Sequence, residues 1–193
     1  MVKSIGKRII FIAVFISGNG SNLKSLIKNF KNNSKIKISL VLSNNSNANG
    51  LVYAKKNKIN YKIINYKSKK KAENTILNLL KENKINIICL AGFMKILSKQ
   101  FIKKFRKPIL NIHPSLLPKY KGLNTHSRVI LNKEKFSGCT VHLVTPALDS
   151  GKIIGQKIVK IRKNENSSKL SKRILKQEHV LYSKTIRKFV ANL

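Results

Sequence analysis

An amide and an imidazole stand two residues apart at the end of an apolar run, as Asn111 and His113. Side chains two apart on a strand point to the same face, so these two groups would lie together. Pro114 removes a backbone donor and favours extended geometry before it, which ends the strand at His113. At the carboxyl edge of a parallel sheet such a pair could meet a ligand. The alternative is a strand end whose polar side chains only satisfy backbone groups.

A carboxylate is available from Asp149, the only aspartate among six acidic residues. It follows a strand-like run and precedes Ser150 and Gly151, which indicates a loop. Brought beside His113, this carboxylate would fix the tautomer of the imidazole and favour its protonated form. The alternative is an Asx-turn beside Gly151.

A glycine-rich turn, Gly18-Asn19-Gly20-Ser21-Asn22, lies between a buried strand and the start of a helix. Free backbone N–H groups and the helix dipole suit an anion at such a point. The turn is not a dinucleotide fingerprint, because Leu23 stands where the third glycine belongs, and no Gly-Lys-Ser/Thr follows to make a P-loop. A small phosphate monoester fits best, and an ordinary turn with Ser21 as helix cap is the alternative.

Two further stretches could serve a substrate. The nonpolar turn Gly92–Leu97 could wall a flat heterocycle and offer it backbone hydrogen bonds, or it could be plain core. Glu178 falls on the inward stripe of the last expected helix, between Ile174 and Leu181. An acid there could meet a substrate amine, or it could pair with one of the many lysines.

Strand and helix patterns alternate along the chain, which predicts an α/β fold: one Rossmann-like domain over 1–193 with a mainly parallel sheet covered by helices on both faces. The expected strands are 8–16, 37–43, 61–64, 86–91, 109–112, 138–144 and 153–161. The expected helices are 22–30, one from about 49, 70–82, 98–105 and 168–190.

The net charge of +35 is extreme, but only six of the 41 basic residues are Arg, and the lysines are spread over every segment. Arg is the better residue for bidentate recognition of phosphate or bases, and a binding surface would gather its charges. We interpret the charge as drift in an AT-rich genome and expect no specific nucleic-acid partner. Cys89 and Cys139 look like core thiols of a reducing compartment. No apolar stretch is long enough to span a membrane, so we expect a cytoplasmic protein.

Taken together, separated motifs in a consistent order closely resemble phosphoribosylglycinamide formyltransferases. The matching segments are Ser17–Leu23, Leu90–Ser98, Leu110–Tyr120, Gly122–His126, Leu148–Gly151 and Gln177–His179. The resemblance implies the formyltransferase fold and transfer of a formyl group from 10-formyltetrahydrofolate to the amine of glycinamide ribonucleotide. It implies no metal, and it leaves a monomer or a homodimer open.

The same resemblance implies the roles of individual residues. Asn111, His113 and Asp149 match the catalytic trio of the family. The residues matched to glycinamide ribonucleotide are Gly20, Ser21, Asn22 and Glu178, and those matched to folate are Lys69, Met94, Lys95, Ile96, Leu97 and Asn111. The N-terminal half would thus bind the ribonucleotide phosphate, and the C-terminal half would bind folate and carry out catalysis.

Some positions depart from the family pattern. Lys69 falls where an Arg is usual near the folate, which keeps the charge but loses the planar fork. Pro146 and Ala147 replace acids common in the loop before Asp149, and Lys121 stands where Pro is frequent. The alternatives are a methionyl-tRNA formyltransferase-like enzyme, whose extra tRNA-binding domain has no counterpart in 193 residues, and a noncatalytic basic protein that binds nucleic acid.

Overall fold

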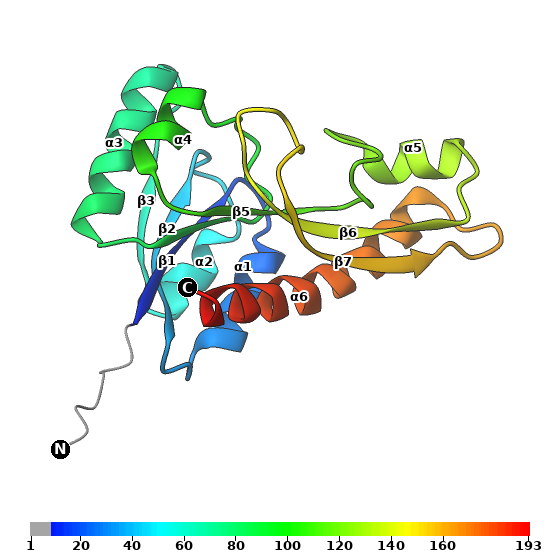
Figure 1. The fold of residues 1–193 in the computed structure, drawn as a ribbon, viewed down its shortest axis with the longest axis horizontal. Coiled ribbons are helices and arrows are strands. Elements are labelled where there is room, and N and C mark those ends of the chain that lie inside the picture. The colour runs from blue at the N-terminus through cyan, green and yellow to red at the C-terminus, as the bar shows by residue number, and fades with distance from the viewer. Residues whose placement is uncertain (1–8) are drawn as a thin grey trace.

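A computed structural model describes residues 9–193. Seven strands form one sheet in the order β3-β2-β1-β4-β5-β6-β7 (Figure 1). The strands are β1 (Ile10–Ile16), β2 (Ile36–Ser43), β3 (Asn60–Ile63), β4 (Ile87–Leu90), β5 (Ile109–His113), β6 (Phe136–Leu143) and β7 (Ile153–Lys160). Pairing from β3 to β5 is parallel, and β6 and β7 add antiparallel to β5. This confirms the predicted mainly parallel α/β sheet.

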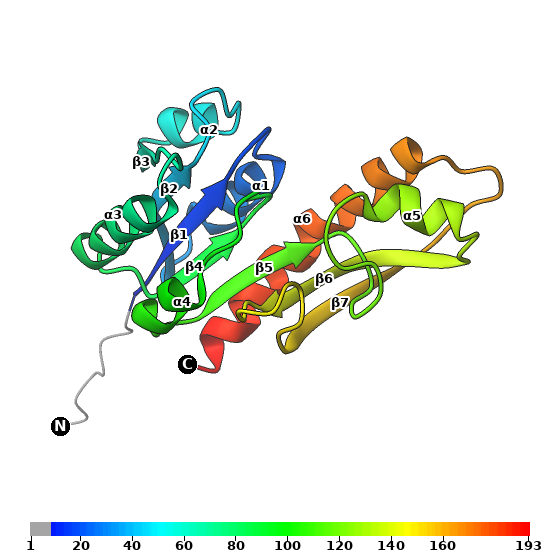
Figure 2. The ribbon, with the colours of Figure 1, turned by 90° about the horizontal axis from the view of Figure 1, so that it is seen from above.

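Helices cover both faces of this sheet (Figure 2). They are α1 (Ser21–Phe30), α2 (Leu51–Lys56), α3 (Lys69–Glu82), α4 (Lys99–Phe105), α5 (Thr125–Leu131) and α6 (Ser167–Ala191). Alternate residues of β1 supply the two cores: Ile12, Val14 and Ile16 face the core shared with α1 and α6. Ala13 and Phe15 face the core shared with α3 and α4. A strand buried on both faces explains the continuous apolar run in the sequence.

The start of α1 differs from the prediction. Ser21 is the first helical residue rather than the cap, and Gly20 precedes the helix with a left-handed φ of 66°. A Cβ on Gly20 would come within 2.5 Å of the Gly50 Cα, so only glycine fits where the two loops meet. Ser98, the expected first residue of a helix, instead lies just before α4. Its hydroxyl caps α4 by accepting from the Phe101 N–H.

Most other elements lie within two residues of their expected bounds. Arg8, the expected first residue of the first strand, lies outside the described residues. The helix α5 was not predicted. Cys89 and Cys139 are both buried free thiols, as expected of core cysteines. Within residues 9–193, no helix combines the length and the apolar character needed to cross a membrane.

Candidate active site

The predicted pair lies where β5 ends. Asn111 and His113 point to the same face and line one cavity of about 720 Å³. His113 is buried at 5% exposure, while Asn111 is half-buried. Because β6 runs antiparallel to β5, His142 lies directly across from Asn111 in the ladder. Cross-strand neighbours share a face of the sheet, so His142 joins the pair in the cavity.

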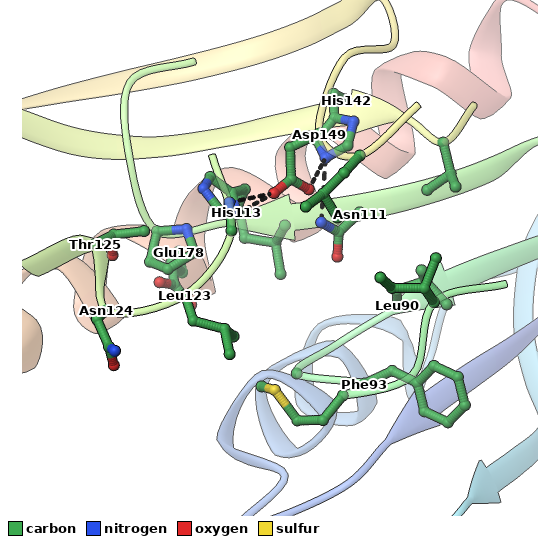
Figure 3. A pocket seen from close by; sticks show the side chains of 18 of the residues that line it. Leu90, Phe93, Asn111, His113, Leu123, Asn124, Thr125, His142, Asp149 and Glu178 are labelled. Carbon is green, nitrogen blue, oxygen red and sulfur yellow. Dashed lines mark hydrogen bonds and ion pairs between the residues drawn. The ribbon is translucent and has the colours of Figure 1, made fainter. Parts of the chain in front are cut away.

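Asp149 lies between the two histidines (Figure 3). Its Oδ2 is 3.4 Å from His113 Nδ1, and its Oδ1 is 3.6 Å from His142 Nε2. The backbone N–H of Gly122 donates to Oδ2 at 2.9 Å. Asp149 has a left-handed φ of 46°, which Asp tolerates better than most residues. One carboxylate therefore faces two imidazoles, and the loop backbone fixes its position.

Both ring nitrogens of His113 face acceptors. Nε2 lies 2.9 Å from the carbonyl oxygen of Tyr120, and Nδ1 faces Asp149. Burial lowers the pKa of His113 below its ordinary value, while the Tyr120 carbonyl and the Asp149 carboxylate oppose that shift. With Nε2–H donated to Tyr120, neutral His113 keeps a bare Nδ1 that can take up a proton beside the carboxylate.

The pKa of Asp149 is lowered even though burial acts to raise it. The two imidazoles that face the carboxylate and the hydrogen bond from the Gly122 N–H outweigh the burial. Asp149 is therefore a carboxylate at neutral pH. A fixed anion at this point can stabilise an imidazolium that forms on either side of it.

A second pair of polar side chains comes from α1 and α6. Asn22 Nδ2 donates to Glu178 Oε2 at 2.7 Å, although the two residues are 156 positions apart. Burial raises the pKa of Glu178, and the Asn22 hydrogen bond only partly offsets this. The Oδ1 atom of Asn22 is buried and has no hydrogen-bond partner among the described residues. Both residues line the cavity, which places an acid at its polar end.

The opposite wall of the cavity is apolar. It is formed by the segment after β4, where Met94 is 64% and Ile96 is 62% exposed, while Leu97 is buried. The Met94 N–H donates to Ser17 Oγ at 2.7 Å, which ties this wall to the end of β1. Large apolar side chains left open in a cavity favour a ligand with an apolar face.

The structure brings most of the residues named from the sequence into this one cavity. Its lining includes Asn22, Met94, Lys95, Ile96, Leu97, Asn111, His113, Asp149 and Glu178. Three others lie outside the lining. Gly20 and Ser21 stand at the start of α1, and Lys69 is an exposed first residue of α3.

Sequence reasoning missed two histidines. His142 lies in β6 opposite Asn111, and only the register of that antiparallel pair reveals its place. His126, on the short helix α5, also lines the cavity, and its Nδ1 is buried with no partner in the described part of the chain. Its position one residue after Thr125, at the start of a weakly patterned helix, gave no periodic signal. Among residues 9–193, no group of three or more His, Cys, Asp or Glu side chains could hold a metal ion.

Comparison with known proteins explains this arrangement. The formyl transferase domain family matches residues 10–186. The chain belongs to the formyl transferase family. This formyltransferase is 38% identical over 182 residues to the phosphoribosylglycinamide formyltransferase of Haemophilus influenzae. The match covers 92% of this chain and 86% of that protein.

Longer relatives and solved structures agree with this assignment. The formyltransferase is 41% identical over 175 residues to the human trifunctional purine biosynthetic protein adenosine-3, and it spans 17% of that protein's length. A crystal structure of phosphoribosylglycinamide formyltransferase from Brucella melitensis is 39% identical, with a TM-score of 0.90 over 96% of this chain and 98% of that one. The fold is therefore that of solved enzymes with this name.

Proposed function

We propose that this formyltransferase moves the formyl group of 10-formyltetrahydrofolate onto the amine of glycinamide ribonucleotide, a step of purine biosynthesis. The observation that carries the proposal is the Asp149 carboxylate between His113 and His142, with Asn111 beside them, at one end of a cavity whose other wall is apolar. The relatives named above favour this reaction over a methionyl-tRNA formyltransferase-like one or a noncatalytic basic protein.

The residues at the end of β5 suit the chemistry of formyl transfer. When bound, the folate supplies an activated formyl carbon. The substrate amine forms a new C–N bond there, the C–N bond to the folate breaks, and a proton must pass from the amine to the departing nitrogen. Asn111 would donate to the formyl oxygen as its negative charge grows. His113 would relay the proton through water, and Asp149 would stabilise the imidazolium.

The cavity would receive the two substrates at its two ends. Its volume of about 720 Å³ lies within the range of small-molecule sites. The apolar segment Met94–Leu97 would cover the pterin, and Lys69 would approach the folate from α3. At the other end, Glu178, which lines the cavity and accepts from Asn22, would meet the glycinamide group. The N-terminal turn at Gly20, Ser21 and Asn22 would receive the ribonucleotide phosphate.

These assignments give the two halves of a single formyltransferase domain, residues 1–193, different roles. The first half would bind the ribonucleotide phosphate, and the second half would bind folate and carry the catalytic residues. We infer that the enzyme works in the cytoplasm, where buried free thiols such as Cys89 and Cys139 stay reduced. We also infer that it acts without a metal or specific nucleic acid, as a monomer or homodimer.

The test is a direct assay. Purified protein is mixed with 10-formyltetrahydrofolate and glycinamide ribonucleotide, and release of tetrahydrofolate is followed together with formylation of the amine. We expect both products in equal amounts. Absence of transfer to glycinamide ribonucleotide, with transfer to a methionyl-tRNA instead, would replace the proposal with its alternative.

A further inference from the structure

The hydrogen bonds of His142 define its state in this structure. Nδ1 lies 2.9 Å from the carbonyl oxygen of Leu143. A carbonyl only accepts, so Nδ1 carries a hydrogen and a neutral ring has its lone pair on Nε2. Asn111 Nδ2, 3.1 Å away, then donates to Nε2. The neutral imidazole therefore holds the nitrogen end of the Asn111 amide.

This bond leaves the oxygen end of the amide free. In Figure 3 the Asn111 carbonyl oxygen points away from His142 into the cavity. In this orientation the outermost atom of Asn111 is an acceptor, whereas a formyl oxygen that gains negative charge needs a donor. Asn111 can stabilise that oxygen best after its amide turns by half a rotation, which places Nδ2 toward the substrate.

A protonated His142 would favour the turned amide. With a hydrogen on Nε2, the ring can donate to the Asn111 oxygen and to Asp149 Oδ1, now 3.6 Å away. The groups that face the ring are Asn111 and His113 from β5, the Leu143 carbonyl from β6, and Asp149 from the following loop. Asp149 is the only anion among these groups, and it lies on the Nε2 side of the ring.

We propose that His142 is a positioning residue whose imidazole selects which end of the Asn111 amide faces the substrate. The neutral ring presents the amide oxygen, and the ring that has taken a proton from solvent presents Nδ2 to the formyl oxygen. The inference rests on the proposed function, since it assigns Asn111 its donor role. It adds a second imidazole, on the other oxygen of Asp149, to the group that acts on the formyl carbon.

Replacing His142 by two amide residues with side chains of different length tests the inference. The side chain of Gln reaches the place of Nε2 and can either donate to or accept from Asn111, whereas Asn reaches only the place of Nδ1. We expect His142→Asn to lower kcat roughly tenfold to a hundredfold, with KM for both substrates changed less than threefold. His142→Gln should restore most of the lost kcat. Equal kcat in the two variants, or an effect confined to KM, would overturn the inference.

The tautomer offers a readout that needs no turnover. In protein labelled with ¹⁵N-histidine, His142 should show a protonated Nδ1 and a bare Nε2 when neutral. Adding 10-formyltetrahydrofolate alone, with no amine to react, should shift Nε2 toward the protonated form. A neutral ring protonated on Nε2, or a ring unchanged by the folate, would contradict the switch. If the wild type fails to formylate glycinamide ribonucleotide, the proposed function fails, while the free protein's tautomer still tests the contact with Asn111.

Discussion

The two ends of the cavity are built in opposite ways. At the polar end, His113, His142 and Asp149 are largely buried, lie within 3.6 Å of one another through Asp149, and are each hydrogen-bonded to the backbone. At the apolar wall, Met94 and Ile96 are mostly exposed and have little to cover them. The polar end is organised before a ligand arrives, which suits chemistry that depends on geometry. The wall contributes mainly when a ligand buries it, which suits binding.

The largest effect should come from breaking the polar end at its centre. We expect Asp149→Asn to lower kcat by a factor on the order of 10²–10⁴, because the amide cannot stabilise an imidazolium on His113. KM for the folate should change little, since the apolar wall is untouched. Steady-state kinetics with both substrates measure the split.

The matched control is Glu82→Gln, which neutralises an exposed acid on α3 outside the cavity. Its kcat should stay within about twofold of wild type, as expected for a surface change away from the site. A fully active Asp149→Asn enzyme would remove Asp149 from the mechanism.

Glu178 sharpens the comparison, because we expect its buried carboxylate to lower stability while it contributes to binding at the polar end. Its pKa is raised by burial, so between its unfolded pKa near 4.5 and the higher folded value the native state binds more protons than the unfolded state. Stability contributed by this group therefore falls as pH rises through that window. Glu178→Gln should raise the free energy of unfolding at pH 7 by on the order of 1 kcal/mol. It should also raise KM for glycinamide ribonucleotide roughly tenfold.

Thermal melts at pH 4 and pH 7 test the sign of this effect. The gain of Glu178→Gln should shrink toward pH 4, where the wild-type carboxyl is mostly protonated in both states. Glu165→Gln is the matched control, since Glu165 is also buried. Burial acts to raise its pKa, but Glu165 accepts from Arg173 at 2.6 Å and from the Arg162 N–H, and its pKa is lowered. That variant should be less stable at pH 7. Equal shifts in the two variants would refute the role of burial.

The local parts of this arrangement could be predicted from the sequence, and the nonlocal parts could not. The two-residue period of a strand puts Asn111 and His113 on one face, and Pro114 marks its end. The place of His142 depends on the register between β5 and β6, which no local pattern encodes. The cap of α1 likewise depends on Gly50, thirty residues after Gly20. The seven-residue helix α5 is too short to show a clear period.

We expect smaller kinetic effects from changes in the apolar wall, where an effect on folate binding can be told apart from an effect on stability. Ile96→Ser removes an exposed apolar side chain that a pterin would cover, so KM for the folate should rise roughly threefold to tenfold with kcat nearly unchanged. Stability should stay within about 0.5 kcal/mol of wild type. The adjacent Leu97 is 5% exposed, and Leu97→Ala should instead cost about 2–4 kcal/mol of stability. If Ile96→Ser leaves KM unchanged, the pterin does not lie on this wall.

The smallest effect concerns Lys69, which lies outside the cavity lining as an exposed residue at the start of α3. A specific contact with the folate would make Lys69→Ala raise KM for the folate about twofold to threefold, with a smaller effect in high salt because the pair is exposed. Lys70→Ala removes the same charge from the next position of the helix and should have no such effect. Equal changes in both variants would mean that the folate senses only the general positive field of this lysine-rich chain, and that Lys69 has no role of its own.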